Sequence, residues 1–67
     1  MSVPLCNELK QWRTKSGMTQ AELANRAGVS RKTINTIENA VFIPSTVLAL
    51  RLAVVFDCSV EDLFSLK

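Results

Sequence analysis

The sequence predicts an all-α fold, in which one compact domain is built from five short helices. Capping residues mark where helices begin, glycines mark where they end, and no run of alternating β-branched residues is long enough for a sheet. A chain of 67 residues folds as a single domain and is only marginally stable by itself. We therefore expect residues 1–67 to form one domain, and the usual additions to the stability of so small a domain are disulfides, metals or oligomerisation.

Start and stop signals place the helices. Two pairs, Thr19 with Glu22 and Ser59 with Asp62, have the spacing of a capping box, in which each side chain bonds an unpaired amide of the other residue. Gly28 ends the second helix because glycine adopts the positive φ of a helix terminus at little cost. The expected helices span about Leu5 to Lys15, residues 20–27, Arg31 to about Asn39, Thr46 to Phe56, and a short segment from Ser59 to near Phe64.

Apolar residues at helical spacing predict the core. Ile34 and Ile37 share one side of the third helix, and Trp12 lies on the apolar stripe of the first. Cys6 and Cys58 are expected to be small buried side chains, with a disulfide between them as the alternative that the sequence leaves open. The absence of histidine argues against a zinc site. The inward faces of the second and fourth helices are expected to be Ala21, Leu23, Ala24 and Ala27, and Ala49, Leu52, Ala53 and Phe56.

The segment from Gln20 to Ile37 indicates the function. Its two helices are separated only by residues 28–30, so they cannot pack side by side and must meet at a steep angle. Ile34 and Ile37 anchor the third helix from below. The side chains left on its outward face are polar or basic: Arg31, Lys32, Thr33, Asn35, Thr36 and Asn39.

This outward face is chemically suited to DNA. Arginine can pair with guanine and asparagine with adenine, and a threonine methyl can touch the methyl of thymine. The third helix carries no acid before Glu38, and its N-terminus, beside Arg31 and Lys32, favours phosphate. Residues 1–32 hold six Lys or Arg and two Glu, whereas residues 33–67 hold two Lys or Arg and four Asp or Glu. One half can therefore face a polyanion.

From about Leu5 to Phe64 the chain resembles the Cro and lambdoid-repressor (Xre-like) family of helix-turn-helix transcriptional regulators. The matching residues are Arg13, Gly17, Thr19, Gln20, Leu23, Ala24, Gly28, Val29, Ser30, Ile34, Ile37, Glu38, Asn39, Pro44, Ser45, Ala49, Leu52, Ala53, Phe56, Ser59, Asp62, Leu63 and Phe64. The resemblance implies a five-helix, lambda-repressor-like domain with its helix-turn-helix at about residues 20–38. It also implies a prokaryotic or phage setting.

The resemblance further implies a role for individual residues. Gln20 would contact phosphate and brace the first base-contacting residue, and Arg13 with Glu38 would form the family's ion pair. The expected DNA-binding residues are Gln20, Ser30, Arg31, Lys32, Thr33, Asn35, Thr36 and Asn39. Among these, the expected base contacts are Arg31, Lys32, Asn35 and Thr36, and the expected phosphate contacts are Gln20, Ser30 or Arg31, and Asn39.

The chain departs from the family pattern at Ala40, Asp57 and Thr46. Ala40 and Asp57 stand where glycine commonly ends a helix, and Thr46 replaces an apolar residue. Aspartate tolerates positive φ fairly well but alanine does not, so we expect residues 40–43 to follow a different course. Phosphate contacts from that loop are therefore left open.

A second apolar stripe follows the fourth helix. Val47, Leu50 and Val54 lie opposite its core stripe, where a lone helix of a small domain should be polar. We expect a two-fold homodimer in which Val47, Leu50, Val54, Phe64 and Leu66 are interfacial. Such a dimer could place two recognition helices in successive major grooves of a palindromic operator.

The sequence thus predicts a DNA-binding transcriptional regulator, a repressor that binds a double-stranded operator as a homodimer. The alternative is an antitoxin, or another protein-interaction module that also binds its own promoter, for which we would expect a flexible segment after the fifth helix. With no His, no Tyr and no glycine-rich phosphate loop, an enzyme is not expected. Neither a cofactor nor a small-molecule ligand is indicated. RNA binding is not favoured, because the sequence shows no aromatic surface on which bases could stack. Without a signal peptide or a membrane-length apolar run, we expect a cytoplasmic protein.

Overall fold

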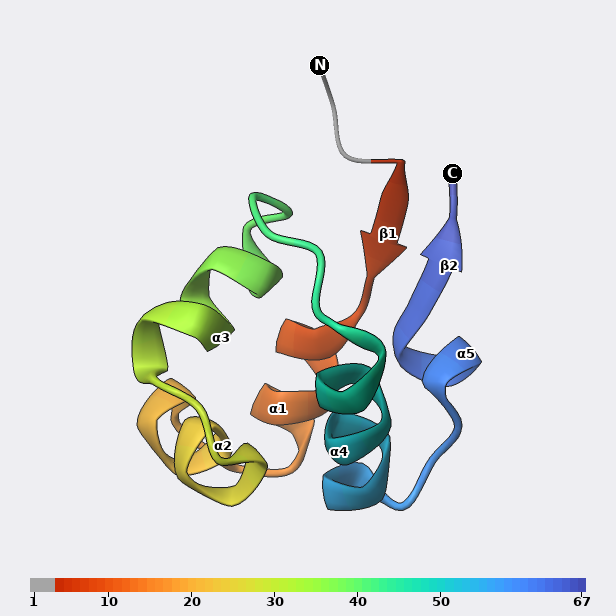
Figure 1. The fold of residues 1–67 in the computed structure, drawn as a ribbon. Helices are drawn as coiled ribbons and strands as arrows, with labels where there is room; N and C mark the ends of the chain where they lie inside the picture. Colours follow the sequence, from red (N-terminus) through yellow and green to blue (C-terminus); the bar gives the residue numbers. More distant parts are fainter. Residues whose placement is uncertain (1–3) are drawn as a thin grey trace.

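Residues 4–67, the part of the chain that the computed structural model describes, form five helices between two short strands (Figure 1). The elements in chain order are β1 (Leu5–Asn7), α1 (Leu9–Lys15), α2 (Gln20–Ala27), α3 (Arg31–Glu38), α4 (Thr46–Phe56), α5 (Val60–Leu63) and β2 (Phe64–Leu66). The helices surround one core, and α2 and α3 lie together on one side of it with α4 against α2.

The two strands correct the expectation of an all-α fold. β1 and β2 pair antiparallel, with Leu5 opposite Leu66. The first helix therefore begins at Leu9 rather than at Leu5, and the side-chain oxygen of Asn7 accepts a hydrogen bond from the Leu9 amide at 3.2 Å where strand gives way to helix. A strand of three residues is too short to show alternation, and its stability comes from a partner at the other end of the chain.

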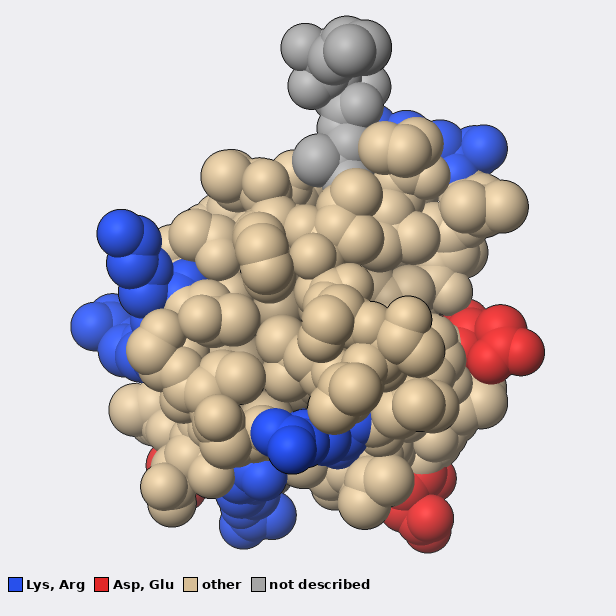
Figure 2. Space-filling model, viewed as in Figure 1, with Lys and Arg blue, Asp and Glu red and all other residues tan. Residues whose placement is uncertain are grey.

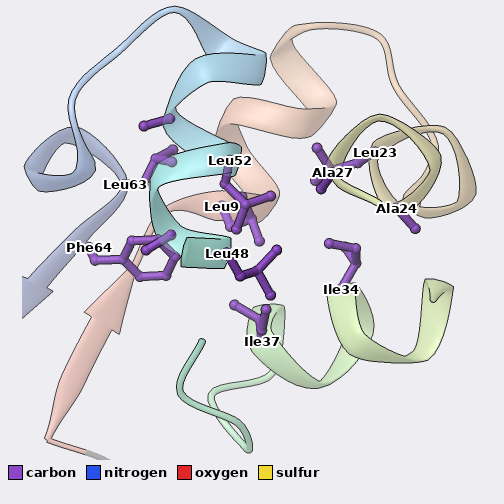
Figure 3. Close-up of a cluster of buried hydrophobic side chains, with 12 residues drawn as sticks. Leu9, Leu23, Ala24, Ala27, Ile34, Ile37, Leu48, Leu52, Leu63 and Phe64 are labelled. Carbon is purple, nitrogen blue, oxygen red and sulfur yellow. The ribbon is translucent and has the colours of Figure 1, made fainter. Parts of the chain in front are cut away.

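The core is made by side chains from all five helices (Figure 3). Those less than 2% exposed are Leu9, Leu23, Ile34, Ile37, Leu52 and Leu63. Phe64 is also part of this core and is 7% exposed. We expected Phe64 at a dimer interface, but its ring fills the protomer's own interior, because β2 begins where α5 ends and points this side chain inward.

The expectations for four individual residues can be compared with the packing. Trp12 is half-buried and its ring packs against Phe56, with centroids 6.0 Å apart, as expected for a core residue. Cys6 is exposed instead of buried, because alternation along β1 turns it away from the core. Ala21 is likewise exposed, since it lies on the outer side of α2. Cys58 is half-buried, and burial raises the pKa of its thiol.

α4 shows how strongly caps decide helix boundaries. Ser45 opens it by accepting a hydrogen bond from the Leu48 amide at 3.1 Å, and Asp57 ends it in the left-handed conformation with φ of 52°. α4 has 11 residues, and within residues 4–67 no helix is long and apolar enough to cross a membrane. With these two caps α4 spans Thr46–Phe56, so the expected bounds of this helix are confirmed.

Candidate nucleic-acid interface

The turn between α2 and α3 is set by three residues. Gly28 ends α2 with φ of 74°, and the following amide of Val29 donates to the carbonyl of Ala24 at 3.0 Å. Ser30 then opens α3, since its Oγ accepts from the Thr33 amide at 3.2 Å. Both helix ends are thus satisfied within the turn, which holds the two helices in a fixed relation.

The start of α2 carries the expected capping box. The Thr19 hydroxyl accepts from the Glu22 amide at 3.1 Å, and the Glu22 carboxylate accepts from the Thr19 amide at 3.0 Å. The hydrogen bond from the Thr19 amide to the Glu22 carboxylate, with a smaller contribution from the Thr19 side chain, holds the pKa of the Glu22 carboxyl below its ordinary value.

Apolar side chains seat α3 against the rest of the domain. Ile34 and Ile37 are at most 1% exposed and point toward α2 and α4 in Figure 3. Ala24 and Ala27 of α2 are buried too, and their small size permits the two helices to approach closely. Val29 is half-buried against the same core. With this side buried, the opposite side of α3 must face solvent.

The solvent side of α3 presents the residues expected to contact DNA. Arg31, Lys32 and Asn35 are exposed and line a shallow hollow of about 320 Å³. Thr33 and Thr36, on the same helix, are half-buried. Figure 2 shows basic side chains grouped on the side of the molecule where α3 lies, without acidic ones among them.

The threonine hydroxyls are committed to hydrogen bonds within α3. Thr36 Oγ1 donates to the carbonyl of Thr33 at 3.0 Å, and Thr33 Oγ1 shares a hydrogen bond with Ser30 Oγ at 2.9 Å. The Asn39 amide similarly donates to Asn35 Oδ1 at 3.3 Å. The threonines thus have methyl groups to offer a ligand, whereas Arg31 and Lys32 retain all their donors.

The carboxylate of Glu38 joins three helices. Arg13 on α1 donates to it twice, from Nε to Oε2 at 2.6 Å and from Nη2 to Oε1 at 3.2 Å, so the expected ion pair is confirmed. Gln20 on α2 donates from Nε2 to Oε1 at 3.1 Å. The side chains of Arg13 and Glu38 are only 11% and 3% exposed. A pair so shielded orients α3 relative to α1 and α2.

Gln20 supports α3 through a different residue from the one expected. Its amide bonds Glu38 at the end of α3, rather than a residue expected to contact bases. An amide nitrogen carries two hydrogens, so one remains for a phosphate. The resemblance to a family indicated the residue but not this partner, because the contact spans 18 positions of the chain.

Sequence reasoning missed Asn7 altogether. Its side-chain nitrogen donates to the carbonyl of Ile37 at 3.0 Å, so the end of β1 closes the last turn of α3. The two residues are 30 positions apart, and no local signal marks the pair. Asn7 thus completes the support beneath the exposed face.

The loop after α3 corrects another expectation. Ala40 was expected to avoid positive φ, yet it adopts φ of 58°. The amide of Ala40 donates to the carbonyl of Ile37 at 3.0 Å, and that of Val41 to the carbonyl of Thr36 at 2.9 Å. These bonds close the end of α3 in the manner of a glycine-ended helix. Tertiary context therefore overrides the preference of alanine.

These features define a helix-turn-helix domain in which the second helix of the motif, α3, exposes basic and amide-bearing side chains. Comparison with known proteins agrees with this class. A helix-turn-helix family model matches residues 9–63. An uncharacterized HTH-type transcriptional regulator of Archaeoglobus fulgidus is 46% identical over 56 residues, covering 84% of this chain and 80% of the relative.

Two solved structures extend the comparison. The SOS-response repressor LexA of Eubacterium rectale has a TM-score of 0.76 at 35% identity, over 81% of this chain and 57% of that one. SinR of Bacillus subtilis, described as the master regulator for biofilm formation and solved in complex with DNA, has a TM-score of 0.73 at 33% identity, over 79% of this chain and 86% of the SinR chain in that complex. The chain belongs to the Xre-like helix-turn-helix family of DNA-binding transcriptional regulators.

Proposed function

We propose that this protein is a repressor that binds a palindromic double-stranded operator as a homodimer, with α3 of each copy in the major groove. The acid-free outward face of α3, led by Arg31 and Lys32, is the observation that carries the proposal. The repressor role is taken from the names of structural neighbours such as LexA.

Individual contacts follow from the chemistry of the face. Arg31 and Asn35 are exposed and can pair with the edges of guanine and adenine, whereas Thr36 offers its methyl group to thymine. Lys32 is a further base or phosphate donor. Phosphate contacts are assigned to Ser30 at the start of α3, to the second amide hydrogen of Gln20, and to Asn39; Thr33, on α3, is half-buried.

The homodimer is supported by apolar surface that the protomer leaves uncovered. Val47, Leu50 and Val54 on α4 are 59%, 54% and 79% exposed, and Leu66 on β2 is 84% exposed. Exposed apolar surface of this kind is typical of interaction sites. To enter successive major grooves, the recognition helices of two protomers related by a two-fold axis must lie about 34 Å apart.

The test is selection from a random duplex library, followed by titration of the selected sequence and of random DNA at two salt concentrations. We expect a palindromic consensus, and Arg31→Ala should weaken binding to it by roughly 1–3 kcal/mol more than binding to random DNA. Lys67→Ala, which removes an exposed positive charge after β2 and outside α3, is the matched control. Equal losses on both DNAs would demote Arg31 to a phosphate contact. The absence of any enriched sequence would refute the proposal and favour a protein-interaction module.

A further inference from the structure

The outward side of α4 continues into a groove along its junction with α2. Val47, Leu50 and Val54 form the exposed apolar stripe on this side. The groove has a volume of about 510 Å³, and these three residues line it together with the end of α2 at Ala27 and Gly28. It is therefore an apolar depression bordered by the helix-turn-helix itself.

Charges of opposite sign lie on opposite sides of the stripe. Arg26 and Arg51 line the groove on the side of α2, whereas Asp57 and Glu61 lie at the corner where α4 turns into α5. All four are exposed, and the one ion pair within residues 4–67 is that of Arg13 and Glu38, so none of the four is paired. Figure 2 shows basic atoms at the lower centre of this face, acidic atoms at its right edge, and uncharged surface between them.

Such a face is complementary to itself. In a two-fold interface, a residue on one side of the axis contacts a residue from the other side of the same face on the partner, and the reverse contact also forms. A face with a basic margin, an apolar centre and an acidic margin can therefore satisfy both margins against a second copy. A partner of one charge sign would leave one margin facing a like charge, which is costly.

We propose that a second copy of this chain docks here, with the acidic α4–α5 corner of each copy entering the basic α2–α4 groove of the other. Arg26 and Arg51 of one protomer then face Asp57 and Glu61 of its partner around the apolar stripe. This rests on the homodimer of the proposed function and specifies how its two copies meet. Because Gly28 borders the groove, the contact lies directly beside the turn that positions α3.

The proposal is tested with two double variants, each of which changes the charge sign of one margin. Arg26→Glu/Arg51→Glu makes both margins acidic, and Asp57→Asn/Glu61→Lys makes both basic; asparagine at 57 tolerates the positive φ found there. Each variant alone should dimerise at least roughly a hundredfold more weakly than the wild type, because like charges now meet. An equimolar mixture should form a heterodimer close to wild-type strength, since opposite margins meet again. Sedimentation equilibrium measures the dimer dissociation constant of the wild type, of each variant alone and of the mixture.

Controls separate the possible failures. Lys10→Glu/Lys15→Glu reverses two exposed charges on α1, which does not line the groove, and should leave the dimer intact. Circular dichroism establishes that each variant is folded. A monomeric wild type would refute the homodimer of the proposed function. A dimeric wild type whose variants dimerise equally well, or whose folded variants remain monomeric on mixing, would overturn the charge pairing alone.

Discussion

Ala40 offers a direct measure of how far tertiary context strains this backbone. It follows the C-cap of α3 with φ of 58°, a region that side chains with a Cβ rarely occupy, and it is exposed, so a change of side chain there removes no packing. The substitution Ala40→Gly therefore isolates the backbone effect.

The magnitude follows from two opposing contributions. Relieving an L-residue of the left-handed conformation gains about 1–2 kcal/mol. Glycine also has more freedom in the unfolded chain, which offsets about 0.4–1 kcal/mol of this gain. The net expectation is that Ala40→Gly raises the free energy of unfolding by about 1 kcal/mol, equivalent to a rise in Tm of about 4–8 °C for a domain of this size.

The assay is thermal unfolding followed by circular dichroism, with all proteins at one concentration because dimerisation makes Tm concentration-dependent. Ala21→Gly is the matched control, since Ala21 is exposed in helical conformation and should lose up to about 1 kcal/mol by the same substitution. If Ala40→Gly lowered Tm as Ala21→Gly does, Ala40 would not occupy the left-handed region and the reasoning would be refuted.

Three further predictions concern the support of the recognition helix. Glu38→Gln should lower the free energy of unfolding, measured by urea denaturation, by about 3 kcal/mol, because it leaves the shielded Arg13 guanidinium without its counter-charge. A loss below about 0.5 kcal/mol would show that the pair is dispensable. Ser30→Ala should lower the free energy of unfolding by about 1 kcal/mol because it removes the cap of α3, whereas Ser30→Thr should keep the cap and most of that free energy. Because the folded-state pKa of Glu22 lies below its ordinary value of 4.5, its contribution is present above that value and is lost as the pH falls through the lowered pKa. Glu22→Gln should therefore flatten the acid limb of a stability–pH curve, and an unchanged limb would contradict this assignment.

The helices were predictable wherever the signal is local. The caps at Thr19, Ser30 and Ser45 act within three residues, so the expected bounds of α2 and α4 match the structure and α3 ends within one residue of its expected end. The exposed face of α3 followed from the same periodicity, because Ile34 and Ile37 leave only one side free.

Features that depend on distant partners were not predictable in this way. β1 gains its conformation from β2, and the left-handed Ala40 contradicts its own local preference. The hydrogen bond of Gln20 to Glu38 and that of Asn7 to the Ile37 carbonyl join residues brought together only by the completed fold. Such contacts leave no periodic or capping pattern in a single sequence.

The pairing of β1 with β2 has a consequence for the order of folding. Leu5 and Leu66 close a loop that contains nearly the whole chain, and the entropy lost in closing a loop grows with its length. We therefore expect the local helix-turn-helix to assemble early and the strands to join late. Mutations in β1 and β2 should then change the unfolding rate and leave the folding rate nearly unchanged. Because Asn7 at the end of β1 bonds the last turn of α3, the recognition helix receives its final constraint only when the two ends of the described chain meet.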